Sequence, residues 1–167
     1  MSPIEKAIRA TLENVPAVMF VAALIIATFF SSNPGMADRY LTWLLFLAVG
    51  VQGLWAGTTH VFFPKVGARY IGWDVSPFQA ELGVADLAIG FVAILSFWQG
   101  LEFKAALVAY LVVFYLGVGL IHIRDAKARN NHAKGNFGAL LGMTLLKAVT
   151  LPVLLWLAIH QQALSPV

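Results

Sequence analysis

The chain has 167 residues, of which 60% are hydrophobic and only 11% are charged, and its mean hydropathy is +0.80. A soluble domain carries about 25% charged residues, so this composition excludes a water-coated globule and indicates a membrane protein. The net charge of +3 is explained by basic residues in the loops beside a lipid bilayer and does not indicate nucleic-acid binding. The chain has no cysteine, which excludes disulfides and thiolate metal sites.

The first residues, SPIEKAIRATLEN, predict a short amphipathic helix. Ser2 is a suitable N-cap, Pro3 suits the first helical position, and Glu5 has the spacing of a capping box. Apolar residues recur on one face of this helix and charged residues on the other. Such a helix lies in the membrane interface and does not cross the membrane.

Apolar runs long enough to cross about 30 Å of hydrocarbon follow along the rest of the chain. The predicted spans are residues 15–30, 41–63, 78–98, 105–123 and 138–160. A cleaved signal peptide is the alternative for the first run, but its apolar stretch is long and its leader contains acidic residues. We therefore predict an all-α fold, a polytopic bundle of five transmembrane helices that forms a single domain over residues 1–167.

The basic residues predict the orientation of the bundle. With five spans, one side of the membrane receives most of them: Lys6, Arg9, Lys65, Arg69, Arg124, Lys127, Arg129 and Lys134. The opposite side receives Arg39 and Lys104. Lys and Arg accumulate in cytoplasmic loops, so the sequence predicts a cytoplasmic N-terminus and an external C-terminus.

Two full charges lie deep inside the predicted spans. Asp86 is about eight residues into the third span and Lys147 about nine into the fifth, which places both about 12–14 Å from the cytoplasmic side. Buried charges in lipid are costly unless they are paired, so we expect an ion pair between neighbouring helices. A role in moving protons or ions, a role in binding a polar ligand, and contact with a partner protein remain open.

A second polar group gathers at the predicted cytoplasmic ends of the spans. Its members are His60, Gln79, Glu81, His122, Asn131, His132 and Asn136. His60, Glu81 and His122 come from successive spans and are expected to face one pocket. Three interpretations stay open: interfacial hydrogen bonding, a substrate or proton pocket, and a weakly indicated zinc or iron site made by these three residues. Asp86 lies about 140° around the helix from Glu81, so we expect the deep pair to be a separate site.

Paired glycines recur at the spacing that lets membrane helices approach closely. GLWAG contains Gly53 and Gly57, and GALLG contains Gly138 and Gly142. Such small-residue faces pack helices within one chain or between two copies of it. A homo-oligomer formed through these faces is therefore a further expectation.

Two longer segments carry a resemblance to a known family. HVFFPKVGARYIGWDVSPFQAELGVADLAIG and the later GLIHIRD with NNHAKGNFG resemble a family of small bacterial membrane proteins of unknown function, DUF6790. The resemblance covers roughly residues 57–152 and implies that five polar residues belong to the family pattern: His60, Gln79, Glu81, His122 and Asn136. It implies a bacterial inner membrane as the location and leaves the activity and any cofactor open.

Three kinds of function are compatible with these features. The first is a protein that binds or moves a small polar solute, an ion or a proton through the His/Glu pocket. The second is a membrane-embedded enzyme on a lipid-like substrate, with Glu81 and His60 or His122 as acid and base or as metal ligands. The third is an accessory or assembly subunit of a larger membrane complex.

Overall fold

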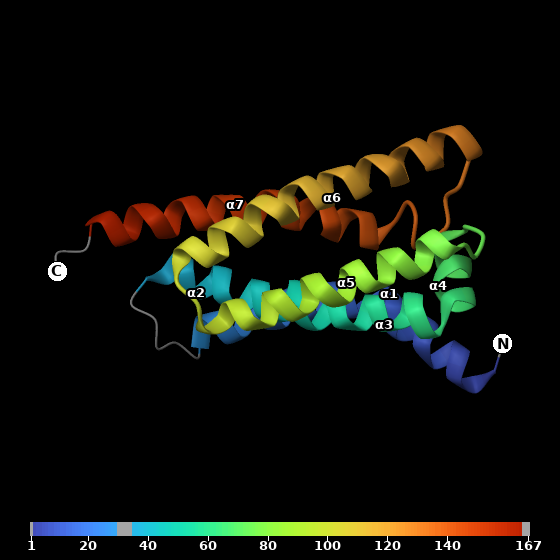
Figure 1. The fold of residues 1–167 in the computed structure, drawn as a ribbon, viewed down its shortest axis with the longest axis horizontal. Coiled ribbons are helices and arrows are strands. Elements are labelled where there is room, and N and C mark those ends of the chain that lie inside the picture. The colour runs from blue at the N-terminus through green and yellow to red at the C-terminus, as the bar shows by residue number, and fades with distance from the viewer. Residues whose placement is uncertain (1, 30–34, 165–167) are drawn as a thin grey trace.

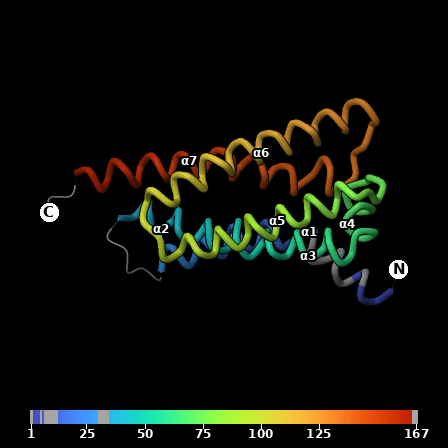
Figure 2. Tube along the Cα trace, viewed as in Figure 1, coloured from blue at the N-terminus to red at the C-terminus, as the bar shows by residue number. Residues whose placement is uncertain are grey.

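The computed structural model describes residues 2–29 and 35–164, and every regular element in them is helical (Figures 1 and 2). In chain order the elements are α1 (Pro3–Phe29), α2 (Met36–Trp43), the π-helix η1 (Leu44–Val51), α3 (Gln52–Phe62), α4 (Pro64–Ile71), α5 (Pro77–Leu95), the 3₁₀-helix η2 (Ser96–Trp98), α6 (Leu101–Arg129) and α7 (Ala139–Leu164). The predicted all-α class is confirmed.

The long helices run alternately in opposite directions, so the two chain termini lie at opposite ends of the bundle (Figure 1). One end carries α4, the start of α1 and the loop between α6 and α7, and we call it the α4 end. The other end carries the start of α2, the link between α5 and α6, and the end of α7, and we call it the C-terminal end.

Within residues 2–29 and 35–164, four helices are long and apolar enough to cross a membrane. They are Met36–Phe62, Pro77–Trp98, Leu101–Arg129 and Ala139–Leu164, and they coincide with the last four predicted spans. The apolar part of α1, Glu13–Phe29, is shorter. The fifth crossing therefore stays a prediction, and the predicted end of that span at residue 30 lies outside the described residues.

Two local features differ from the predictions. The prediction of a separate interfacial helix is wrong, because α1 runs without a break from Pro3 to Phe29 and Pro16 lies inside it. The other difference is α4, a helix of eight residues that follows the second span directly. Pro64 ends the second span as expected, but a proline also suits the first position of a helix, and here it begins the next one.

Glycines bring α3 and α5 into backbone contact. A Cβ atom added at Gly57 would lie 2.6 Å from the Gly83 carbonyl oxygen, and one added at Gly53 would lie 3.1 Å from the Gly90 Cα atom. The face that carries Gly53 and Gly57 is thus occupied within the chain, so the expectation that it joins two copies is wrong. Gly142, in contrast, has no such neighbour within 4 Å among the described residues.

Candidate functional site

A cavity lies between α3, α5, α6 and α7, deep within the predicted spans, and both apolar and polar side chains form its wall. Its volume is about 250 Å³. The polar and aromatic residues of its wall include Gln52, His60, Trp73, Asp86, Phe114, Tyr115, His122, Thr144 and Lys147. Between Gln52 and His60 on α3 the wall extends about 12 Å along the helix axis, from the middle of the bundle towards the α4 end. We call this the central cavity.

Lys147 is buried and fully bonded at the deep end of the central cavity. Its Nζ atom donates to Gln52 Oε1 at 2.7 Å and to the Ala48 carbonyl oxygen at 3.2 Å, and it lies 4.6 Å from the centre of the Tyr115 ring. Ala48 belongs to η1, a π-helical segment of the kind often found at functional sites. The ammonium group, which has three N–H bonds, therefore has two acceptors and one aromatic face around it.

Asp86 does not form the predicted ion pair with Lys147. Although its charge acts on Lys147 and Tyr115, the carboxylate and the ammonium group do not approach within the 4.0 Å of an ion pair. Among the described residues no donor hydrogen-bonds to this carboxylate. The prediction failed because a neutral amide, Gln52, and a backbone carbonyl supply the contacts of Lys147, which leaves Asp86 as an unpaired acceptor in the cavity wall.

His60 is held by Gln79 at the α4 end of the cavity. The Gln79 Nε2 atom donates to the Pro64 carbonyl oxygen at 2.8 Å and lies 3.2 Å from His60 Nδ1. An amide nitrogen can only donate, so Nδ1 accepts this bond and the proton of the neutral ring is on Nε2. His60 is therefore an N–H donor at its remaining nitrogen.

His122 has the opposite tautomer. Its Nδ1 atom lies 2.6 Å from Asn136 Oδ1, and the orientation of that amide is set because Asn136 Nδ2 donates to the Asn131 carbonyl oxygen at 2.8 Å. Nδ1 must donate to an amide oxygen, so the Nε2 atom of the neutral ring carries a lone pair. The ring also stacks on Trp73, with centroids 5.1 Å apart and planes 13° apart.

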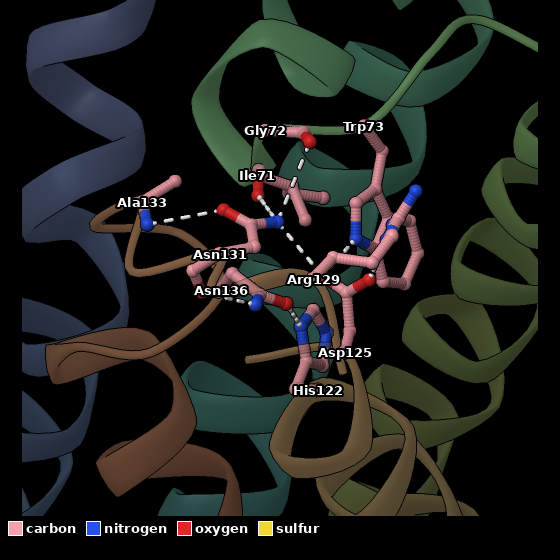
Figure 3. A network of polar contacts seen from close by, with 9 residues as sticks. All are labelled: Ile71, Gly72, Trp73, His122, Asp125, Arg129, Asn131, Ala133 and Asn136. Carbon is pink, nitrogen blue, oxygen red and sulfur yellow. Dashed lines mark hydrogen bonds and ion pairs between the residues drawn. The ribbon is translucent and has the colours of Figure 1, made fainter. Parts of the chain in front are cut away.

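Asn131 joins the segments that close the α4 end (Figure 3). Its Nδ2 atom donates to Asp125 Oδ2 at 2.7 Å and to the Ile71 carbonyl oxygen at 3.0 Å, while its Oδ1 atom accepts from the Ala133 amide at 3.2 Å. Asp125 Oδ2 also accepts from Trp73 Nε1 at 2.8 Å. The end of α4, the end of α6 and the loop after α6 are thereby held together, and Trp73 is fixed against the His122 ring.

We expect Asn131→Ala to lower the unfolding free energy by about 1–2 kcal/mol, because it leaves the Ile71 carbonyl and the Ala133 amide without this partner. That corresponds to a fall of about 3–6 °C in the melting temperature of the purified protein. His132→Ala is the matched control, since His132 is exposed in the same loop. Equal melting temperatures for the two variants would contradict this role of Asn131.

The structure shows where the other predicted site residues lie relative to one another. The structure brings His60, Gln79, His122, Asn131 and Asn136 together at the α4 end. Glu81 is exposed and does not line the cavity, and in the described part of the chain no three His, Asp or Glu side chains are placed to hold a metal ion. Asp86 and Lys147 line the same cavity as His60 and His122, so the expected separation of the two sites is wrong.

Comparison with known proteins assigns a family to the chain. Residues 13–164 match the model of a family of unknown function, DUF6790. The chain belongs to this family. No curated protein and no solved structure matches it.

A second cavity lies at the C-terminal end, with a volume of about 640 Å³. In its wall Lys104, which is 3% exposed, forms an ion pair with Asp38 at 2.6 Å, and its Nζ atom also lies 2.7 Å from Thr42 Oγ1. Lys104 precedes the predicted fourth span, but in the structure it lies in the first turn of α6, where a buried charge requires a partner. Asp38 and Thr42, four residues apart at the start of the second predicted span, are the sequence feature that could have indicated this pairing.

An apolar layer separates the two cavities. Along α2 and η1 it lies between Asp38 and Gln52, and along α6 it lies between Lys104 and Tyr115. Its fully buried side chains are those of Leu41, Leu44, Leu45, Val49, Val108, Leu111 and Leu151. The bundle thus has polar side chains towards each end and an apolar section between them.

Proposed function

We propose that the protein binds a small polar solute or a proton in the central cavity and moves it across the membrane. One observation carries this proposal: an unpaired carboxylate, Asp86, lines a cavity between membrane-spanning helices. An ionisable side chain in that position costs several kcal/mol without a partner, and such residues in membrane proteins mark ion and substrate pathways.

The apolar layer supports movement in addition to binding. Carriers hold their substrate near the middle of the membrane and open to one side at a time. A cavity on each side of an apolar section fits that scheme, because a shift of α6 and α7 against the other helices opens one cavity as it closes the other. The π-helical segment η1 lies in this section and supplies the Ala48 carbonyl to Lys147.

The distribution of exposed basic residues supports the proposed orientation. The exposed basic side chains at the α4 end include those of Lys6, Lys65, Arg69, Arg124, Lys127, Arg129 and Lys134. At the C-terminal end Lys104 pairs with Asp38, and Arg39 is half-buried. We therefore place the α4 end in the cytoplasm and the C-terminus outside a bacterial inner membrane, with α1 as a fifth crossing helix.

The alternative functions have less support. The enzyme hypothesis needs Glu81 as an acid or a metal ligand beside the histidines, and Glu81 is exposed away from them. An accessory subunit gives no reason for an unpaired carboxylate inside a cavity. If the protein forms a homo-oligomer, we propose that α7 pairs at Gly142, where the helix surface is open.

The test is proton movement into proteoliposomes that contain a pH-sensitive dye, driven by a potassium diffusion potential. We expect flux above that of protein-free vesicles, and at least a tenfold loss in Asp86→Asn because this change removes the cavity carboxylate. Glu81→Gln is the matched control, since it makes the same change on the exposed face of α5. Wild-type vesicles without proton flux, and without uptake of any polar solute, would refute the proposal.

A further inference from the structure

We infer that the solute taken by the central cavity is a small organic cation with N–H donors, such as a primary ammonium group, bound by Asp86. This inference rests on the proposed function and assigns a substrate class to the same cavity. It follows from which hydrogen-bonding groups of the wall are already satisfied and which are not.

Lys147, the cationic side chain of the cavity wall, already has partners and does not offer a free site to an anionic ligand. Lys147 Nζ is bonded to Gln52 Oε1 and to the Ala48 carbonyl oxygen, and its remaining side faces the Tyr115 ring. A carboxylate or phosphate ligand would have to displace one of these partners and would meet Asp86 in the same cavity. Both effects oppose the binding of an anion.

The charged acceptor of the wall, in contrast, is free. No described residue donates a hydrogen bond to Asp86, which lines the cavity, so its carboxylate oxygens can accept from a ligand. A primary ammonium group offers three N–H donors, two of which can meet the two oxygens of one carboxylate. Charge-assisted bonds of this kind are about twice as strong as bonds between neutral groups.

Aromatic and neutral groups complete the match. Trp73 and Phe114 line the cavity, and aromatic faces attract cations. His60 contributes an N–H donor, which suits a neutral oxygen of the solute or a bound water. With a volume of about 250 Å³, the cavity has room for a small amine.

Binding of radiolabelled methylammonium to the purified full-length protein, measured by scintillation proximity, tests this inference. We expect saturable binding that ammonium and guanidinium displace and that acetate and methanol do not. Asp86→Asn should weaken binding at least tenfold, Asp86→Glu should retain part of it, and Glu81→Gln should bind as the wild type does. Size-exclusion profiles of all variants show whether a loss of binding reflects misfolding.

Three results would overturn the inference. The first is displacement of methylammonium by acetate, and the second is equal binding by Asp86→Asn and the wild type. The third is an absence of methylammonium binding while proton flux remains, which removes the assigned substrate class but leaves the proposed function standing. If neither methylammonium, acetate nor methanol binds and no proton flux occurs, the proposed function fails together with the inference.

Discussion

Gly57→Ala is expected to force α3 and α5 apart and to destabilise the protein by about 2–3 kcal/mol, in the range measured for overpacked cores. The added methyl group would lie 2.6 Å from the Gly83 carbonyl oxygen and 2.8 Å from the Leu87 backbone nitrogen. Neither backbone atom can move without the whole of α5. We expect the melting temperature of the purified protein to fall by about 5–10 °C.

The control is the same substitution at a glycine with open space around it. Gly142 has no neighbour within 4 Å of an added Cβ atom among the described residues. Because alanine is favoured over glycine in a helix interior by about 0.5–1 kcal/mol, Gly142→Ala should leave the melting temperature unchanged or raise it slightly. If both variants melt together, the close contact between α3 and α5 does not exist.

Lys104→Met is expected to cost about 3 kcal/mol, because it removes the cation that compensates the Asp38 carboxylate in a buried ion pair. Lys104 is 3% exposed, and Asp38, at 24%, retains some access to solvent, which places the expected cost at the lower end of the measured range. A methionine has nearly the length of the lysine side chain, so the loss comes from the charge and its hydrogen bonds. The measurement is thermal unfolding of the purified protein.

A double variant separates the charge from the packing. In Asp38→Asn with Lys104→Met no charge is left uncompensated, so we expect at least half of the lost stability to return. A double variant that is as unstable as Lys104→Met would show that the aliphatic stem of Lys104, and not its pairing with Asp38, stabilises the C-terminal end.

Much of the helical arrangement could be predicted from the lengths of the apolar runs. The predicted start of the third span, at residue 78, lies within one residue of the start of α5, where Ser76 has an extended backbone and Pro77 takes the first helical position. The α4 helix and the π-helical segment were not foreseen. The first is too short and too polar for a hydropathy pattern, and the second depends on contacts with neighbouring helices that a linear pattern does not contain.

The sequence predicts most of the residues that form the site but not the contacts between them. The sequence predicts that Glu81 faces His60 and His122, but it is Gln79 that contacts His60. The depth of Asp86 and Lys147 correctly placed them at one level. Depth does not determine how far each helix is rotated, and this rotation turned Lys147 towards Gln52 and left Asp86 unpaired. Gln52 carries no charge, so the pattern of charged residues in the spans does not indicate it as the partner of Lys147.

The central claim is that a cavity with polar side chains reaches deep between the membrane-spanning helices, and cysteine accessibility tests it most directly. The natural chain has no cysteine, so single-cysteine variants need no altered background. Thr144 lines the cavity, whereas Val149, one and a half turns further along α7, is 62% exposed on the outer surface of the bundle. In proteoliposomes we predict that Thr144→Cys reacts with a charged, water-soluble methanethiosulfonate and that Val149→Cys, facing lipid, does not. Thr144→Cys as unreactive as Val149→Cys would contradict the account.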